Sequence, residues 1–340
     1  MKNSEKNNSL LATPPKTIIM ALQKMANLDY FFLVGELEKL RGGRLAKIYE
    51  LGPGRFRFKF AKEGNQYQLV AELGTRLHLT KFVEEAPNKP TTFAMVLRKY
   101  LDNAVLTSVE QVNFDRIVVL KLEKKEKYSL VFEMYGTRGN LLLCDCAGKI
   151  IQPYTTEEKG GRVLKRGEIY TAPKQSSGLN VAPFYQEEVL SRVGIGGRKP
   201  EELDESEKGA VEKEIERIKS RISEPRAYYE AGKPVAFSSI ELKKFEGLEK
   251  KEFEKMSDAL DEYYANFSEP VAKSAEGKEE KALKKLEFLA EQQRKTAEEN
   301  EAKAKEQREI GDAVWNNLEK ADELITNARK EGKKKIEVEL

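Results

Sequence analysis

The chain has 340 residues, of which 34% are charged, and a formal net charge of +3 at pH 7. Its mean hydropathy of −0.63 and short apolar runs exclude a membrane-spanning helix, which needs about 20 apolar residues. The length is sufficient for two or three units with separate cores. Two cysteines, Cys144 and Cys146, are too few for a four-cysteine zinc site and fit a reducing compartment.

Residues 9–22 make a poor signal peptide, because two adjacent prolines interrupt a short apolar segment. We therefore expect a cytoplasmic protein. The charges are unevenly distributed: residues 1–175 carry 29 Lys and Arg against 19 Asp and Glu, and the remainder carries 31 against 38. The basic first half favours a phosphate-rich partner such as nucleic acid, and the acidic second half indicates solvated helices.

The first helix is expected over residues 28–40, after a polar, proline-containing and flexible tail over 1–24. Helical spacing places four residues near one stripe: Phe31, Phe32, Gly35 and Leu40. A glycine pair at positions 42 and 43 then ends the helix, because glycine tolerates the left-handed conformation.

Alternating polarity predicts strands after this helix. Arg55, Arg57 and Lys59 fall on one face of such a strand, and the intervening phenylalanines fall on the other. Further strands are expected over 67–73, 76–80, 109–122, 128–135, 140–145 and 150–152, with a helix over 93–101. The pattern predicts an α+β first unit over 25–172, with a largely antiparallel sheet system and flanking helices.

Residues 173–268 are expected to form a second, all-α module. Two helices, 184–192 and 201–219, flank a hydrophobic–glycine turn that resembles helix-hairpin-helix modules. Its glycines, Gly194, Gly196 and Gly197, would let backbone N–H groups contact a phosphate at the start of the second helix. A simple interhelical turn is the alternative, and Glu201 and Glu202 disfavour phosphate there. A small β-hairpin over 227–239 and a helix over 248–267 would complete the module.

The last 60 or so residues carry a heptad pattern, which predicts a coiled-coil arm over 269–340. One row runs from Leu283 to Ile325 and the other from Leu286 to Ala328. The middle of both rows is Ala, Gln and Asn, so the arm is expected to have modest stability and could mediate self-association.

Catalytic and metal-binding patterns are poorly represented. His78 is the only histidine and lies in the alternating stretch Leu77-His78-Leu79, as expected of a strand residue without a catalytic role. Multi-histidine metal sites are thereby excluded, and neither a phosphate-binding P-loop nor a dinucleotide fingerprint occurs. We expect no enzymatic activity, no cofactor and no metal.

Residues 92–120 are the most informative stretch, because they place Asp115 and Arg116 at the mouth of an apolar strand. Together with residues 27–49, 133–143 and 228–267, this stretch resembles the NFACT family of ribosome-associated quality control proteins. The resemblance covers most of residues 25–330 and implies an N-terminal domain similar to formamidopyrimidine-type DNA glycosylases. It also implies a returning helix and a further RNA-binding domain beyond the arm, so we expect an N-terminal fragment.

Glycosylase chemistry is not expected despite the implied fold. Such enzymes use an N-terminal proline amine and usually a zinc finger, whereas neither Met1 nor Met25 precedes a proline and two cysteines cannot build the finger.

The resemblance implies that Asp29 and the pair Asp115–Arg116 handle transfer RNA. Arg116 could contact a phosphate or a base edge, or could instead be locked structurally to Asp115 or Asp29. Asp29 also suits the N-cap of the first helix. Further phosphate contacts are expected at Arg98, Lys99, Arg138, Arg55, Arg57 and Lys59, each with a solvated surface role as the alternative.

The resemblance further implies a factor that binds large ribosomal subunits obstructed by peptidyl-tRNA and the attached nascent chain. It would recruit tRNA for template-free addition of C-terminal residues, with alanine tails expected, while the ribosome performs the peptidyl transfer. The arm would run along the ribosomal RNA surface toward the stalk base. The alternative function is a coiled-coil protein-binding scaffold with a basic nucleic-acid-binding anchor domain. High salt should weaken a phosphate-driven complex far more than a coiled-coil one.

Overall fold

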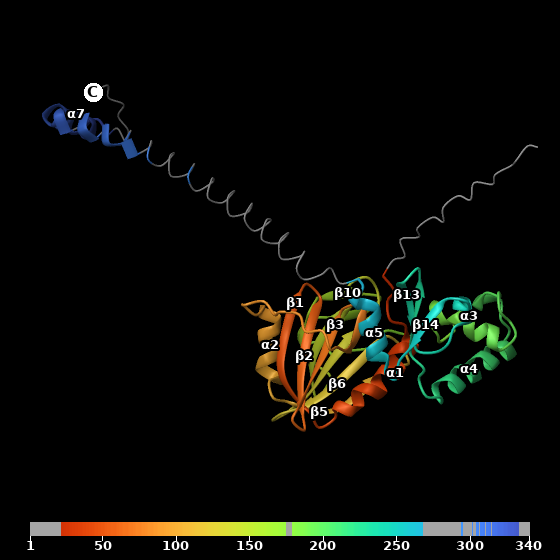
Figure 1. Cartoon of the computed structure of the whole chain (residues 1–340). Helices are drawn as coiled ribbons and strands as arrows, with labels where there is room; N and C mark the ends of the chain where they lie inside the picture. Colours follow the sequence, from red (N-terminus) through yellow and green to blue (C-terminus); the bar gives the residue numbers. More distant parts are fainter. Residues whose placement is uncertain are drawn as a thin grey trace, which may run out of the picture. The chain divides into compact units, whose positions relative to one another are not determined.

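A nine-stranded antiparallel sheet dominates the first of two compact units, which ends at Phe267 (Figure 1). The computed structural model describes residues 22–174, 179–267 and 315–332, with isolated residues and short groups between 294 and 313. The strand order is β4-β3-β2-β1-β5-β6-β7-β8-β9. The strands are β1 Arg44–Gly52, β2 Arg55–Lys62, β3 Asn65–Glu72, β4 Arg76–Leu79, β5 Val105–Gln111, β6 Ile117–Glu123, β7 Lys127–Glu133, β8 Asn140–Asp145 and β9 Ile150–Pro153.

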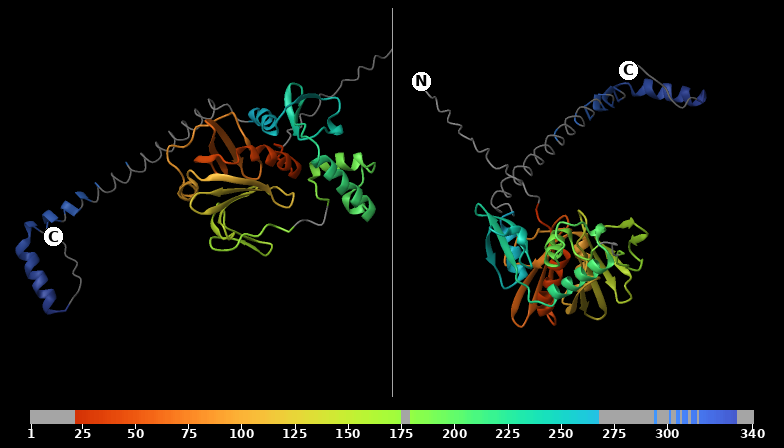
Figure 2. Two further views of the ribbon diagram at one scale, coloured as in Figure 1. Left: turned by 90° about the horizontal axis from the view of Figure 1, so that it is seen from below. Right: turned by 90° about the vertical axis from the view of Figure 1, so that its right-hand side faces the viewer.

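The sheet folds over on itself so that its two halves face one another. β1 and β5 are paired through Arg44 and Val105, and Figure 2 shows the strands on either side of this junction as two layers. The rings of Phe58 in β2 and Phe132 in β7 meet across the interior with centroids 5.5 Å apart. The predicted alternation is confirmed, because all three phenylalanines of β2 are fully buried.

The predicted first helix is confirmed as α1 Asn27–Leu37, followed by one 3₁₀ turn, η1 Glu38–Leu40. Gly42 follows with φ +85°, as expected of a helix-ending glycine. The predicted stripe is wrong in part, because the core face is formed by Leu28, Leu33 and Leu37. Helix α2 Thr92–Leu101 packs on β1, and the Thr91 hydroxyl accepts the Ala94 N–H at its start.

The strand predicted over 109–122 is in fact a hairpin, because a turn at residues 112–116 separates β5 from β6. No glycine marks this turn, so the apolar alternation continues through it in the sequence. Two short strands, β10 Glu157–Lys159 and β11 Arg162–Leu164, form a separate small ladder beyond β9.

The prediction that the second module is all-α is wrong. Helices α3 Pro183–Arg192 and α4 Glu205–Lys219, with η2 Pro200–Glu202 between them, precede a three-stranded sheet and α5 Met256–Ala265. The sheet consists of β12 Arg226–Glu230, β13 Lys233–Ser238 and β14 Glu249–Glu252, with η3 Lys243–Phe245 in the β13–β14 connection.

The β-hairpin predicted over 227–239 is confirmed as β12 and β13. The helix predicted over 248–267 is divided between β14 and α5. Lys and Glu at 249–252 suit a helix by propensity, but here they form an exposed, charged edge strand.

Helix α1 joins the large sheet to residues 179–267. The half-buried Glu36 carboxylate accepts hydrogen bonds from the N–H groups of Met256 and Ser257 and from the Ser257 hydroxyl, at the first turn of α5. A negative side chain is stabilising at that position, because the free N–H groups of a helix start carry partial positive charge. Residues 22–26 have no regular secondary structure, and Gln23 exchanges hydrogen bonds with the Phe237 backbone of β13.

The second unit, residues 268–340, is described in part. Helix α7 spans Leu318–Lys330, and the described residues between 294 and 313 are helical. Most of the predicted coiled-coil arm and residues 1–21 of the predicted tail lie outside the described residues, so the coiled coil stays a prediction. Among the described residues, no helix is long and apolar enough to span a membrane. No group of three His, Cys, Asp or Glu side chains in that part could hold a metal ion.

Candidate nucleic-acid interface

Asp29, the third residue of α1, joins three segments at the start of the helix. Its side chain is fully buried, and one oxygen accepts the Ala26 N–H at 2.7 Å. The Tyr185 hydroxyl of α3 donates to the other oxygen. Ser239, which follows β13, donates its N–H to the Tyr185 oxygen at 2.9 Å. The carboxylate therefore holds α3 and the end of β13 against the first turn of α1.

The expectation that Asp29 caps the helix as its first residue is wrong, because Ala26 occupies the N-cap and Asp29 lies three residues further on. Its bond to the Ala26 N–H is the acidic half of a capping box. Burial raises the pKa of Asp29 from 3.8 to about 6, although the hydrogen bonds from Tyr185 and Ala26 act in the opposite direction.

The β5–β6 turn has an unusual backbone. Asn113 and Phe114 both have positive φ, +54° and +51°, as do the two central residues of a type I′ turn. The Asp115 N–H donates to the Val112 carbonyl at 2.9 Å and closes the turn. Asparagine tolerates this conformation, but an aromatic residue with positive φ is strained.

Two amide side chains anchor this turn to α1. The Asn27 amide donates to the Phe114 carbonyl at 3.0 Å. The Gln111 amide donates to the Asp115 carbonyl and to the Asn27 carbonyl, both at 2.8 Å. The turn that carries Asp115 and Arg116 is therefore fixed at the N-terminal end of α1, next to Asp29.

Asp115 and Arg116 do not form an ion pair with each other. The Asp115 carboxylate accepts the backbone N–H of Arg116 at 2.7 Å, and the Arg116 carbonyl accepts the Met134 N–H. The Arg116 guanidinium makes no hydrogen bond or ion pair with any residue in the described ranges. Burial and Asp29 raise the pKa of Tyr30, and the positive charge of Arg116 partly offsets this shift, so the guanidinium acts on the same site.

Arg138 lies in the β7–β8 loop, which leaves the sheet at the same end as Arg116. It lies between Gly136 and Gly139 in the chain, and its side chain is exposed. The Gly136 carbonyl accepts a hydrogen bond from the Lys24 ammonium at 2.9 Å. A Cβ atom at Gly139 would lie 2.5 Å from the Gly74 nitrogen, and φ there is +54°. The loop therefore needs glycine at this position, and the close approach fixes the base of the loop against the β3–β4 turn.

The other predicted phosphate contacts lie elsewhere. They belong to β2, a strand of the large sheet, and to α2, which Figure 1 places on the opposite side of this sheet from α3 and α4. Arg55 pairs with the Glu84 carboxylate, Arg57 donates to the Glu84 carbonyl, and Arg98 donates twice to the Ile48 carbonyl. Lys59 is half-buried and Lys99 is exposed. The structure therefore forms a second basic cluster, in which all three arginines already have internal partners.

The glycine turn between α3 and α4 does not lead directly into α4. Gly194 and Gly197 have positive φ, and the Gly197 N–H donates to the Glu187 carboxylate at 3.2 Å. Gly196 packs beside Ser191. Helix α4 begins only at Glu205, where Asp204 accepts the Glu207 N–H at 2.8 Å. A phosphate contact at these glycines stays a prediction.

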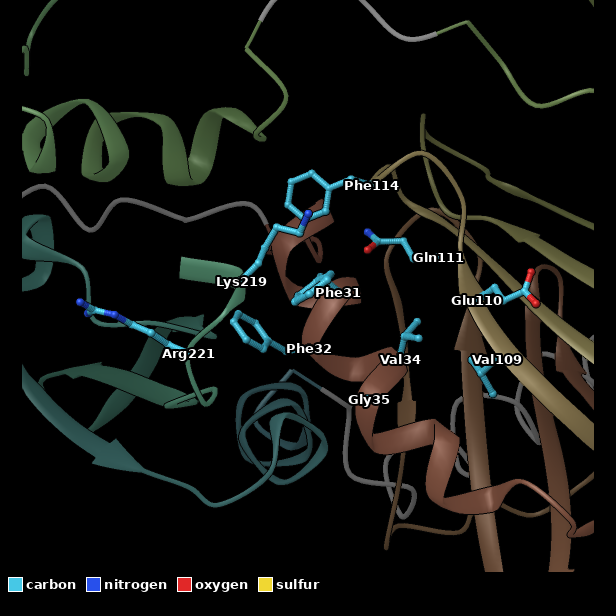
Figure 3. Close-up of a pocket in the computed structure, with 10 residues that line it drawn as sticks. All are labelled: Phe31, Phe32, Val34, Gly35, Val109, Glu110, Gln111, Phe114, Lys219 and Arg221. Atoms are coloured by element: carbon cyan, nitrogen blue, oxygen red, sulfur yellow. The ribbon is translucent and has the colours of Figure 1, made fainter. Parts of the chain in front are cut away.

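An open aromatic groove of about 580 Å³ lies between α1, β5 and the end of α4 (Figure 3). The sequence prediction placed Phe31, Phe32 and Gly35 near one helical stripe, and all three line this groove. It also missed Phe114, Lys219 and Arg221, which complete it. Adjacent phenylalanines in one helix turn point about 100° apart, so at least one of the two rings lies toward the margin of a core-facing stripe, and this was the signal in the sequence.

The raised pKa of Asp29 predicts a specific pH dependence. The folded protein binds this proton more tightly than the unfolded chain, so the Asp29 contribution to stability rises as the pH falls from above 6 toward 3.8 and then levels off. The difference in unfolding free energy between wild type and Asp29→Asn should therefore shift in favour of wild type by up to about 3 kcal/mol over this range. Urea unfolding of both proteins at several pH values measures it, and a constant difference would contradict the burial of an ionised Asp29.

Comparison with known proteins identifies the family. The family model "NFACT N-terminal and middle domains" matches residues 29–184 and 179–340. The archaeal Rqc2 homolog aRqcH of Methanocaldococcus jannaschii is 30% identical over 92% of this chain and 53% of its own length. The Rqc2 homolog RqcH of Streptococcus pneumoniae is 29% identical over 71% of this chain and 48% of its own. The chain thus spans about half the length of these curated relatives.

Solved structures show the same fold at lower identity. The fibrinogen binding protein from Staphylococcus aureus is 22% identical with a TM-score of 0.58, covering 70% of this chain and 98% of that one. The N-terminal part of the fibronectin/fibrinogen-binding protein from Streptococcus suis is 21% identical with a TM-score of 0.57, covering 71% and 99%. With a family model that matches most of its length, the chain belongs to the NFACT family, as its sequence motifs indicated.

Proposed function

We propose that this chain is an RNA-binding factor of ribosome-associated quality control. It binds large ribosomal subunits that still carry peptidyl-tRNA, and it recruits tRNA for template-free C-terminal tailing, with alanine as the expected residue. One observation carries the proposal: the Arg116 guanidinium has no internal partner in the described part of the chain, yet its backbone is held firmly against α1. Relatives named as Rqc2 homologs and as ribosome quality control complex subunits support the same role.

Each part of the site has a role in this proposal. Arg116 and Arg138 offer guanidinium groups to phosphates or base edges at one end of the sheet, and Lys24 adds a positive charge to the same loop. Asp29 is buried and has protein partners, so it positions the site rather than touching RNA.

The remaining elements of the proposal concern the whole assembly. Peptide-bond formation would belong to the ribosome, so the chain acts without enzymatic chemistry of its own and without a cofactor. It would work in the cytoplasm, contact ribosomal RNA, and extend its C-terminal arm toward the stalk base.

The second candidate function is a coiled-coil scaffold with a basic anchor domain. The side chain of Trp315, near the start of α7, is 75% exposed, and Leu318 and Ile325 of α7 are also exposed. Exposed apolar side chains on one helix suit a protein partner, or a second copy of the arm.

Sedimentation with ribosomal subunits separates the two functions. The chain should co-sediment with large subunits that carry peptidyl-tRNA, and it should bind empty large subunits several-fold more weakly. Arg116→Ala should remove this preference for the peptidyl-tRNA-carrying subunits. Equal binding to both kinds of subunit, unchanged in Arg116→Ala, would favour the scaffold and contradict the proposed function.

A further inference from the structure

The aromatic groove presents three rings of different orientation within contact of one another. Phe31 meets Phe32 with centroids 5.4 Å apart and meets Phe114 at 5.9 Å, both edge to face. All three rings are half-buried, and each lines the groove (Figure 3). A flat ring that entered here would find aromatic surface on more than one side.

Phe114 is held in the groove at a cost. Its φ of +51° lies in the left-handed region, where an L side chain costs roughly 1–2 kcal/mol. Glycine or asparagine would relieve this strain in a hairpin turn, and full burial of the ring in a core would offset it. Phe114 packs only in part against the second hydrophobic cluster, and its ring remains half exposed at the groove. A strained aromatic ring that stays partly exposed suits a binding role.

Positive charge accompanies the rings. The Lys219 ammonium lies 4.7 Å from the centroid of Phe114 and 5.2 Å from that of Phe31, and it also pairs with Glu216 at 2.7 Å. Arg221 also lines the groove, but its side chain extends away from the three rings (Figure 3). A groove for an apolar peptide side chain would have no use for the Lys219 ammonium beside its rings, whereas a nucleotide brings a phosphate with its ring.

Gln111 adds a polar edge. Its amide nitrogen is committed to the carbonyls of Asn27 and Asp115, which fixes the side chain at the groove wall. Its Oε1 atom accepts no hydrogen bond from the described residues and remains available as an acceptor for a base edge.

We propose that this groove binds an unpaired nucleobase of RNA, stacked on Phe114 and Phe31, with its phosphate toward Lys219. The inference rests on the proposed RNA-binding function and extends it, because it places a base-stacking site next to the Asp115–Arg116 turn. The groove would discriminate single-stranded from paired RNA, since a base within a duplex cannot leave its stack without cost.

Three labelled RNAs test this proposal with the full chain: a stem–loop, the same stem–loop with abasic sites in the loop, and a blunt duplex of equal length. Fluorescence anisotropy should show the wild type preferring the first over the other two. Phe114→Leu and Phe31→Leu should each weaken stem–loop binding by roughly 5- to 100-fold and leave the abasic RNA unaffected. Phe82→Leu is the matched control, because Phe82 is 61% exposed and lies outside the groove.

The outcomes separate the groove from the function on which it rests. If the wild type binds none of the RNAs, the proposed function fails and the groove with it. If it binds RNA while the groove variants keep the full preference for the stem–loop, the groove alone is contradicted. That second result is also expected if the groove takes an apolar peptide. Thermal melts and the abasic RNA identify a variant that has lost its fold, because such a variant no longer binds either the stem–loop or its abasic version.

Discussion

Arg116→Ala is expected to weaken tRNA binding by about tenfold or more, while the melting temperature stays within about 2 °C of wild type. A charge-assisted hydrogen bond from a guanidinium contributes about 1.5–3 kcal/mol, and this side chain makes none within the described protein. Its removal should therefore weaken tRNA binding while changing the stability of the fold little. Fluorescence anisotropy with labelled tRNA, alongside thermal unfolding, measures both quantities.

Two variants sharpen this test. Arg116→Lys keeps the charge but loses the planar fork, so its affinity should fall between wild type and Arg116→Ala. Arg166→Ala removes an equally free, exposed arginine from another part of the basic half and should change affinity little. Wild-type affinity in Arg116→Ala would show that the tRNA site lies elsewhere, with the second basic cluster around Arg55 and Arg98 as the next place to examine.

Asp29→Ala is expected to lower the free energy of unfolding by about 2–3 kcal/mol. The substitution leaves the buried Ala26 N–H without its acceptor and removes one partner of the Tyr185 hydroxyl. The relief of burying a carboxylate offsets part of this cost, and the Tyr185 hydroxyl can turn toward Ser239, which lies 3.0 Å away. Urea unfolding, with the m-value as a check on two-state behaviour, gives the number.

Asp29 and Arg116 should also differ in how they affect binding. Tyr185→Phe removes the hydroxyl that joins Asp29 to α3 and is expected to cost about 1 kcal/mol without changing any charge. If Asp29 is a positioning residue, Asp29→Asn and Tyr185→Phe should bind tRNA within a few-fold of wild type when both are folded. A tenfold loss in a fully folded Asp29→Asn would instead place the carboxylate in contact with RNA.

The main sheet could be predicted from the sequence because its signal is local. Alternation in β2 puts three phenylalanines on one face, and each of them is fully buried. The end of α1 was equally visible, since Gly42 adopts the positive φ that glycine permits. These features depend on residue types within a few positions of one another, which single-sequence patterns can capture.

The β5–β6 turn and β14 could not be predicted in the same way. Asn113 and Phe114 adopt positive φ because the side chains of Asn27 and Gln111 anchor the carbonyls around them, and one of these anchors lies in another element. Residues 249–252 become a strand because β12 offers a free edge to a segment with helical propensity. In both places, contacts between distant segments override local preference.

The candidate site could likewise be predicted only in its local features. The motif residues Asp29, Asp115 and Arg116 could be named from the sequence, but their partners could not. Tyr185 and Ser239 are distant from Asp29 along the chain, and the groove combines α1, β5 and the end of α4. The ion pair with Asp115 or Asp29, which was the structural alternative for Arg116, is absent from the described residues, and this absence makes the guanidinium available to a ligand.

The most direct test of the central claim is tRNA binding by the full wild-type chain at two salt concentrations. At least three cations, Lys24, Arg116 and Arg138, gather at one end of the sheet, so phosphate contacts should dominate the affinity. We expect specific binding that falls roughly tenfold or more between about 50 and 200 mM salt. No binding at low salt, or an affinity that salt leaves unchanged, would contradict the account.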